Sequence, residues 1–412
     1  MKCVVDDDVV LSRPLEGPLS AHIEGFAKWA REEGYAAFSR HRQVLLAAGF
    51  SRWLEQRAVD VRSISKEHVT QYLQSRMNAV RMLRGGNAAM RQFMDYLRHK
   101  GVIPTKKIPP PHLTPVDLAV QAFERFLRNE RILANATIVN YLPFVHRFLT
   151  DRFSDGPVML SRLSASDVAR FVQCQAPRLH VKRAKLLTTA LRSFLRYAEY
   201  RGDIVSDLAS AVPTVASWSM TSIPRAIPAD TVRQLLSSIN RHTPMGLRNY
   251  AILLLLSRLG LRAGEVAQLE LEDINWNGGY VNVKGKGGQR NTLPMPSDVG
   301  AAIAAYLQDG RPQTRSRRVF LRGKAPIRGF LDQSAVGSIV RNTLAHAGIK
   351  APTKGAHQFR HALATEMLSR GASLTEIGEV LRHRSPETTM IYTKIDVEAL
   401  RTLALPWPGG VQ

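Results

Sequence analysis

The side chains best suited to chemistry lie in the carboxy-terminal half of the chain and are mainly arginine, histidine and tyrosine. His357 and Arg360 are three residues apart, so on a helix they share a face and can reach one target. A guanidinium presents paired N–H donors that fit phosphate oxygens better than the point charge of lysine. Further along are His383 and Tyr392, whose phenol can serve as a nucleophile. These residue types favour chemistry on a phosphodiester.

Each of these residues also has an ordinary explanation when it is considered alone. A tyrosine on a short helix is usually part of an amphipathic core, and His383 could be a structural histidine. Arg262 has Glu265 three residues further on, a spacing typical of an ion pair on a helix surface. The functional interpretation therefore depends on these residues occurring together in one chain.

In combination, residues 225–412 resemble the catalytic domain of tyrosine recombinases, the family of lambda-type phage integrases and Xer-type recombinases. The first matching segment is LGLRAGE at residues 259–265. The second begins as HQFRHALATEML at His357 and continues as VLRHRSPETTMIYT, which contains Tyr392. Between them, Gly285-Lys286-Gly287 is similar to the family's hairpin lysine.

The resemblance implies a role for each matching residue, and the implied catalytic set is Arg262, Lys286, His357, Arg360, His383 and the nucleophile Tyr392. The two arginines would stabilise charge on the phosphate and favour the phenolate of Tyr392. Both histidines would add hydrogen bonds, His357 would assist proton removal, and Lys286 would protonate the leaving 5′ oxygen. The product would be a 3′-phosphotyrosine ester, formed without ATP, metal or cofactor. Glu265 would orient the arginines.

One position departs from the family pattern. Members commonly carry glycine just before the last histidine, whereas this chain has Arg382. A long cationic side chain there would change how His383 approaches the phosphate, or would make a further DNA contact.

Local sequence signals predict the elements that position these residues. A helix over Leu247–Leu259 is apolar on nearly all sides and hence buried. The helix from His357 ends at Gly371, and Ser373 with Glu376 forms a capping box for the next helix. Ser385 and Pro386 are expected to open the short helix that carries Tyr392. Strands are predicted at Leu269–Ile274, Tyr280–Val283 and Arg290–Pro294.

The first 210 residues are predicted to form two similar helical modules. Aromatic and apolar positions recur at an offset of roughly 97 to 101 residues, as in Phe26 and Phe123 or Tyr96 and Tyr197. Proline-rich sequence at 104–115 and a linker at 213–228 separate the parts. The expected domains are a SAM-like module at 1–105, a core-binding module at 114–210 and a catalytic domain at 225–412. The expected fold is mainly α with a small antiparallel sheet.

The charge of the chain indicates a polyanionic partner. Lys and Arg number 57 against 34 acidic residues, a formal net charge of +23. No apolar run approaches the ~20 residues of a membrane span, so the chain is expected to be cytoplasmic and to bind double-stranded DNA. Cys3 and Cys174 are isolated and predict reduced thiols. The candidates for DNA contact are Arg311, Arg315, Arg317, Arg318, Arg322, Lys324 and Arg382.

The favoured function is a site-specific recombinase or integrase, of a mobile element, that acts as a multimer on two DNA duplexes. A final helix at 396–405 is expected to dock on a neighbouring protomer, as the family resemblance implies, or to pack on its own domain. Two alternatives remain at this point. One is relaxation of DNA in the manner of a type IB topoisomerase, and the other is an accessory DNA-binding protein without turnover.

Overall fold

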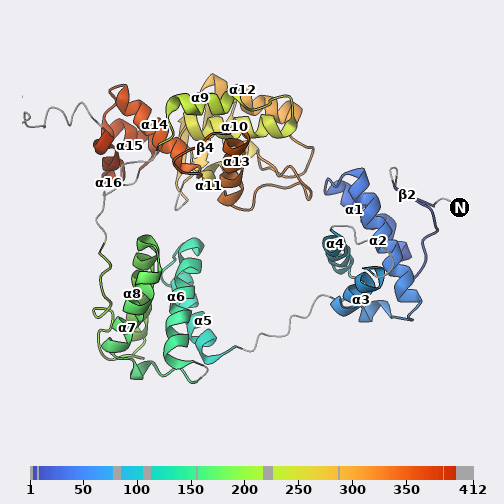
Figure 1. The fold of residues 1–412 in the computed structure, drawn as a ribbon, viewed down its shortest axis with the longest axis horizontal. Helices are drawn as coiled ribbons and strands as arrows, with labels where there is room; N and C mark the ends of the chain where they lie inside the picture. Colours follow the sequence, from blue (N-terminus) through green and yellow to red (C-terminus); the bar gives the residue numbers. More distant parts are fainter. Residues whose placement is uncertain are drawn as a thin grey trace, which may run out of the picture. The chain divides into compact units, whose positions relative to one another are not determined.

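The structure is a computed structural model of the full chain, and it describes residues 3–6, 9–77, 85–104, 113–154, 156–216, 226–285, 288–383 and 385–395 (Figure 1). The chain divides into two compact units, one formed by residues 1–107 with 222–412 and the other by residues 108–221. Separate hydrophobic cores form within residues 5–103, 116–212 and 227–362, with a smaller one within 364–392. The fold is mainly helical with a small antiparallel sheet, as the sequence predicts.

Residues 3–104 form a helical module whose core is built on aromatic side chains. The ring of Phe26 packs against Phe93 and Tyr96 at centroid distances of 4.9 and 5.6 Å. The elements are the strands β1 (Cys3–Asp6) and β2 (Val9–Leu11), the helices α1 (Ser20–Glu32), α2 (Ala37–Glu55), α3 (Lys66–Met77) and α4 (Gly86–His99), and the 3₁₀ turn η1 (Val61–Ser63).

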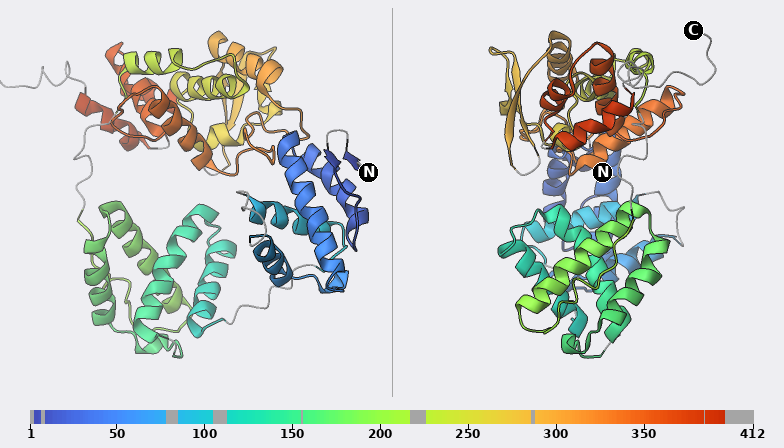
Figure 2. Two further views of the ribbon diagram at one scale, coloured as in Figure 1. Left: turned by 45° about the vertical axis from the view of Figure 1, so that its right-hand side comes forward. Right: turned by 90° about the vertical axis from the view of Figure 1, so that its left-hand side faces the viewer.

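The hairpin of β1 and β2 was not predicted. Its strands are short, and the acidic residues of this segment obscure an apolar pattern, yet Val5, Val9 and Leu11 are buried. β-branched residues suit such a half-buried pleated surface. The hairpin contacts α1 and α2 (Figure 2).

Residues 113–216 repeat the order of the four helices, without the hairpin and with one additional 3₁₀ turn. The ring of Phe123 packs against Phe194 and Tyr197, each at a centroid distance of 5.3 Å, as their counterparts do in the first module. Capping boxes at Thr114 and Ser164 open two of the helices. The elements are α5 (Pro115–Asn129), α6 (Asn135–Phe153), η2 (Leu160–Arg162), α7 (Ala165–Gln175), η3 (Ala176–Arg178) and α8 (Val181–Tyr200).

Residues 226–395 combine helices with a three-stranded antiparallel sheet in the order β3-β4-β5. Residues 251–256 of α10 are all buried, so this helix is the centre of the core. The helices are α9 (Ala229–Ser237), α10 (Pro244–Arg258), α11 (Ala263–Gln268), α12 (Ser297–Ala305), α13 (Gln333–His346), α14 (His357–Ser369), α15 (Leu374–Leu381) and α16 (Pro386–Thr389). The strands are β3 (Ile274–Asn275), β4 (Tyr280–Lys284) and β5 (Arg290–Pro294). The remaining elements are the 3₁₀ turns η4 (Leu271–Asp273) and η6 (Met390–Ile395) and the π-helical segment η5 (Tyr306–Gly310).

The first predicted strand of this sheet is mostly a turn. Over Leu269–Asp273 the backbone pairs with the segment at 317–319: the amide of Leu271 donates to the carbonyl of Arg317, and that of Val319 to the carbonyl of Leu269, each at 2.9 Å. The Asp273 carboxylate also accepts from the amide of Glu270 at 3.0 Å, which closes the 3₁₀ turn η4. Only Ile274 and Asn275 then pair with β4.

Among the helices that the structure describes, none has both the length and the apolar character needed to cross a membrane.

Candidate active site

Three segments of the chain meet at the guanidinium of Arg360, which is 2% exposed. Its Nη1 donates to the carbonyl of Gly260 at 2.7 Å, and its Nη2 donates to the carbonyl of Leu381. These two bonds join α14 to the end of α15 and to the turn after α10, where Gly260 has a φ of +56°. Burial, together with the nearby charges of Arg262 and Arg382, lowers the pKa of Arg360 to about 9.

Glu265 on α11 binds two arginines with its two carboxylate oxygens. Oε1 accepts from Nη1 of Arg262 at 2.8 Å, and Oε2 accepts from the backbone amide of Arg262 at 2.9 Å and from Nη2 of Arg382 at 3.0 Å. The Glu265 side chain is 4% exposed, whereas that of Arg262 is 36% exposed. The carboxylate therefore fixes Arg262 while its guanidinium still reaches the surface, which suits the orienting role predicted for Glu265.

Arg382, which occupies the position of the family's glycine, points into this cluster. Its backbone is left-handed, with φ of 53°, where it ends α15. Its side chain is 9% exposed, and Nε and Nη1 are buried without a hydrogen-bond partner among the described residues. From the sequence it was a candidate for DNA contact, but the structure directs it to Glu265. Burial lowers its pKa, and Arg262 adds to this effect.

His383 follows Arg382 and lies close to the same charges. Its Nδ1 is 2.7 Å from Oγ1 of Thr389 on α16. Burial, reinforced by Arg360 and Arg262, lowers the pKa of His383 to about 4, so the ring is neutral at neutral pH. The capping box of Ser373 with Glu376 opens α15 as predicted, and that helix carries His383 at its end.

Tyr392 lies inside this group of side chains and is 1% exposed. Its hydroxyl is 2.9 Å from Nδ1 of His361. Burial raises the pKa of Tyr392 to about 12, and the charge of Arg360 offsets only part of that effect. The family resemblance implies that the arginines favour the phenolate, but in the structure burial has the larger effect on the pKa of Tyr392.

The local structure around Tyr392 also differs from the expected helix. α16 has only four residues, after which the chain tightens into the 3₁₀ turn η6 that carries Tyr392. Pro386 is at the start of α16 as expected, but the Ser385 side chain makes no capping hydrogen bond. The tyrosine is held by packing with Ala364, Ile377 and Leu381.

His361 is not among the site residues predicted from the sequence. It follows Arg360 directly and is four residues after His357, so it lies on the helix face of that residue. The two imidazole rings pack edge to face, with centroids 4.6 Å apart. The HQFRH segment thus held a signal, a second histidine at helical spacing.

The basic residues at 311–324 differ in their partners and in their exposure. Arg311 donates to the carbonyls of Ser316, Arg318 and Val319 and so closes its own loop. Arg317 pairs with Glu272, and Arg318 pairs with Glu270 at 3.3 Å. Arg315 and Lys324 are exposed, Arg322 is half-buried, and the side chain of Arg317 is 64% exposed despite its pairing, so these four remain accessible to an outside partner.

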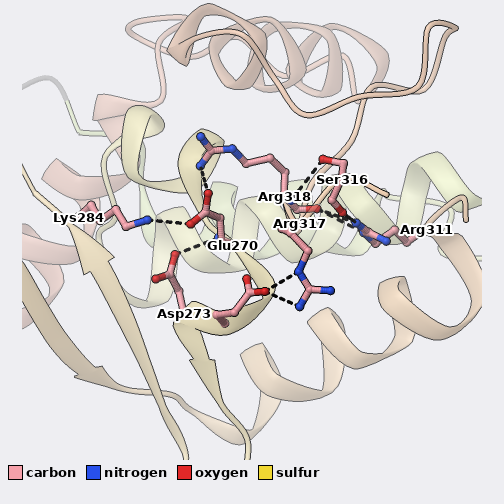
Figure 3. A network of polar contacts seen from close by, with 8 residues as sticks. Glu270, Asp273, Lys284, Arg311, Ser316, Arg317 and Arg318 are labelled. Atoms are coloured by element: carbon pink, nitrogen blue, oxygen red, sulfur yellow. Dashed lines mark hydrogen bonds and ion pairs between the residues drawn. The ribbon is translucent and has the colours of Figure 1, made fainter. Parts of the chain in front are cut away.

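Figure 3 shows Glu270 between Arg318 and Lys284, the last residue of β4. Lys284 donates to Glu270 at 2.8 Å, and this hydrogen bond lowers the pKa of the carboxyl. Lys284 is thus held by a carboxylate at the base of the hairpin. Lys286 in the turn of that hairpin lies outside the described residues, as does the helix predicted at 396–405.

Within the ranges that the structure describes, no three His, Cys, Asp or Glu side chains are grouped to hold a metal ion. Cys174 is a free, exposed thiol.

The sequence of the chain matches known recombinases. Residues 225–399 match the model of the phage integrase family. The tyrosine recombinase XerD of Mycobacterium tuberculosis (strain ATCC 25618 / H37Rv) is 30% identical over 312 residues, which cover 71% of this chain and 97% of XerD. The chain belongs to the tyrosine recombinase family. It is therefore a DNA breaking–rejoining enzyme.

Another relative extends the match to the amino-terminal module. The y4rA protein of Sinorhizobium fredii (strain NBRC 101917 / NGR234), which bears an integrase/recombinase name, is 55% identical over 412 residues and all of both chains.

Solved structures show the same fold at low sequence identity. The XerH site-specific recombinase, bound to a palindromic difH substrate, has a TM-score of 0.55 at 18% identity and covers 71% of this chain and 97% of its own. A lambda integrase (residues 75–356) dimer bound to a COC′ core site has a TM-score of 0.52 at 16% identity and covers 67% of this chain and 94% of its own.

Removal of the Glu265 carboxylate is expected to destabilise the catalytic part. Glu265→Ala leaves the buried Arg382 without its counter-charge, a loss of about 3–5 kcal/mol in the free energy of unfolding. Adding Arg382→Gly should recover part of that loss, because it removes the buried charge and glycine suits a left-handed backbone. Denaturant unfolding of the two single variants and the double variant measures this coupling. Losses that simply add would contradict the ion pair described here.

The histidines of the site are expected to make stability depend on pH. His361 and His383 have folded pKa values of about 4, below the unfolded value of 6.5, so the unfolded chain binds more protons between these limits. The free energy of unfolding is thus highest above that window and falls as the pH falls through it. The melting temperature of a double His361→Asn, His383→Asn variant should drop less between about pH 7.5 and about pH 5 than that of the parent. The exposed His242, changed to Asn, is the control and should leave the parent's drop unchanged; an equal drop in the double variant would contradict the assignment.

Proposed function

We propose that this enzyme is a site-specific recombinase that cleaves and rejoins DNA through a 3′-phosphotyrosine ester on Tyr392. The observation that carries the proposal is the convergence of side chains from α11, α14, α15 and η6 on one place. The hydrogen bonds of Arg360, Glu265 and His361 join these elements, and the charges of Arg262 and Arg360 both act on His383. The charge of Arg360 acts on the phenol of Tyr392, and a phenol near a guanidinium suits attack on an anionic diester.

The proposed division of labour follows from the chemistry of each group. Arg262 and Arg360 stabilise the charge that grows on the non-bridging oxygens as the phenol attacks. His357 and His383, the latter neutral at neutral pH, supply hydrogen bonds to the same phosphate. Lys286 is proposed as the acid that protonates the 5′ oxygen as it leaves. One ester replaces another, so the broken bond is conserved for rejoining.

The proposed substrate is double-stranded DNA held by a multimer of the enzyme. The net charge of +23 supports a polyanionic partner. The XerH and lambda integrase structures of similar fold are DNA complexes, and a lambda integrase tetramer bound to a Holliday junction has a TM-score of 0.50 at 15% identity, covering 78% of this chain and 88% of its own. The proposed assembly is accordingly a group of protomers on two DNA sites, with the predicted helix at 396–405 as the link between neighbours.

Integration or transposition of a mobile element is the proposed biological setting. The integrase/recombinase name of y4rA, whose match extends over both helical modules, supports this setting. The two modules are proposed to be the DNA-binding parts that accompany the catalytic domain at 225–412.

Loss of the phenol oxygen at residue 392 is expected to abolish the covalent intermediate. A DNA duplex nicked so that the cleaved fragment diffuses away traps the adduct, which a denaturing gel separates from free protein. The parent enzyme should form the adduct and Tyr392→Phe should form none, while both shift the duplex equally in a native gel. As a control, Tyr280→Phe on β4 should form the adduct at the parent rate. Adduct formation by Tyr392→Phe would place the nucleophile elsewhere and overturn the proposal.

A further inference from the structure

The hydroxyl of Tyr392 is held by an imidazole that the family resemblance does not assign. Nδ1 of His361 is 2.9 Å from the phenol oxygen, and the two rings meet at 63° with centroids 5.7 Å apart. His361 is on α14, which ends at Ser369, whereas Tyr392 is on η6, so two separate elements create this contact. Hydrogen-bond distance to the reacting proton is the first requirement for a general base.

The protonation states favour a phenol that donates and an imidazole that accepts. Burial, with the charges of His357 and Arg360, lowers the pKa of His361 to about 4. Burial raises the pKa of Tyr392 to about 12. At neutral pH the phenol therefore keeps its proton and the imidazole is neutral, so the Oη–H of Tyr392 can donate to Nδ1. The phenol of Tyr392 is therefore protonated, and so only weakly nucleophilic, before a phosphate binds beside it.

We propose that His361 is the catalytic residue that accepts the proton of Tyr392 during DNA cleavage. This proposal rests on the proposed function. In the cleavage step the Oη–P bond forms and the bond from phosphorus to the 5′ oxygen breaks. The phenol proton passes to Nδ1 of His361, and the 5′ oxygen takes a proton from Lys286, the proposed acid. In rejoining, each proton returns by the same route.

A weakly basic imidazole is adequate for this task. The phenol oxygen becomes far more acidic as its bond to phosphorus forms, so the proton moves when attack is well advanced. The incoming phosphate also brings a negative charge beside a ring that otherwise faces cationic or neutral groups: Arg360 and His357 on its own helix, His383 after α15, and Tyr392. That charge favours the imidazolium. The resemblance assigned assistance with this proton to His357, whereas the geometry of the phenol contact points to His361.

The variant His361→Asn tests whether His361 takes the proton of Tyr392 or only holds its hydroxyl in place. The Asn amide oxygen can accept a hydrogen bond from Tyr392 but cannot take its proton at neutral pH. We expect single-turnover cleavage of the nicked duplex to slow by about 100-fold or more, with DNA binding and melting temperature close to those of the parent. His361→Ala, with added imidazole, is the companion variant, and imidazole should restore part of its rate. His242→Ala, at an exposed site, should cleave at the parent rate.

A substrate with sulfur in place of the bridging 5′ oxygen identifies which proton is affected. A thiolate leaves without an acid, so this substrate should restore cleavage to Lys286→Ala but not to His361→Asn. Parent-like cleavage by His361→Asn, or its rescue by the sulfur substrate, would overturn the inference. Tyr392→Phe, run in parallel, distinguishes the two proposals. An adduct formed by that variant would overturn the proposed function. Parent-like cleavage by His361→Asn, with no adduct from Tyr392→Phe, would overturn only the role of His361.

Discussion

The site is organised around one buried positive charge, the guanidinium of Arg360. A guanidinium taken out of water is costly unless its donors are satisfied. Here the carbonyls of Gly260 and Leu381 accept from it, and both belong to places where the backbone turns sharply. The turns after α10 and at the end of α15 are therefore fixed by the same side chain. Those turns also determine where Arg262 and His383 are placed.

The carboxylate of Glu265 supplies negative charge to this cluster of arginines. It is the acidic group that pairs with Arg262 and Arg382, and it is itself buried. The family pattern commonly has glycine where this chain has Arg382, so the second arginine is a departure from that pattern. The extra guanidinium adds positive charge to the site and ties the segment that carries His383 to α11. The site is thus more cationic than the family pattern predicts, which suits an anionic substrate.

Much of this arrangement could be predicted from the sequence, because the signals are local. The capping box at Ser373, the apolar helix before Arg262 and the repeated aromatics of the two modules each follow from short-range patterns. The sequence could not predict that Leu269–Asp273 pairs with a distant loop, because the competing partner is some 45 residues away, as between Glu272 and Arg317. It also could not reveal that burial dominates the acidity of Tyr392, since burial is a property of the packed fold. The contact of His361 with Tyr392 could not be predicted either, because it spans 31 residues.

Fixed guanidinium groups are proposed to make a DNA phosphate attackable by Tyr392. Arg262 tests this proposal most directly, because its side chain is 36% exposed and can be shortened without opening a buried cavity. The measurement is the single-turnover rate of covalent adduct formation by Arg262→Ala at saturating DNA. Arg258→Ala is the control, since Arg258 is 56% exposed and pairs with Asp298 at 3.0 Å. We expect a rate about 100-fold lower for Arg262→Ala and an unchanged rate for Arg258→Ala. Equal rates for the parent and Arg262→Ala would contradict the proposal.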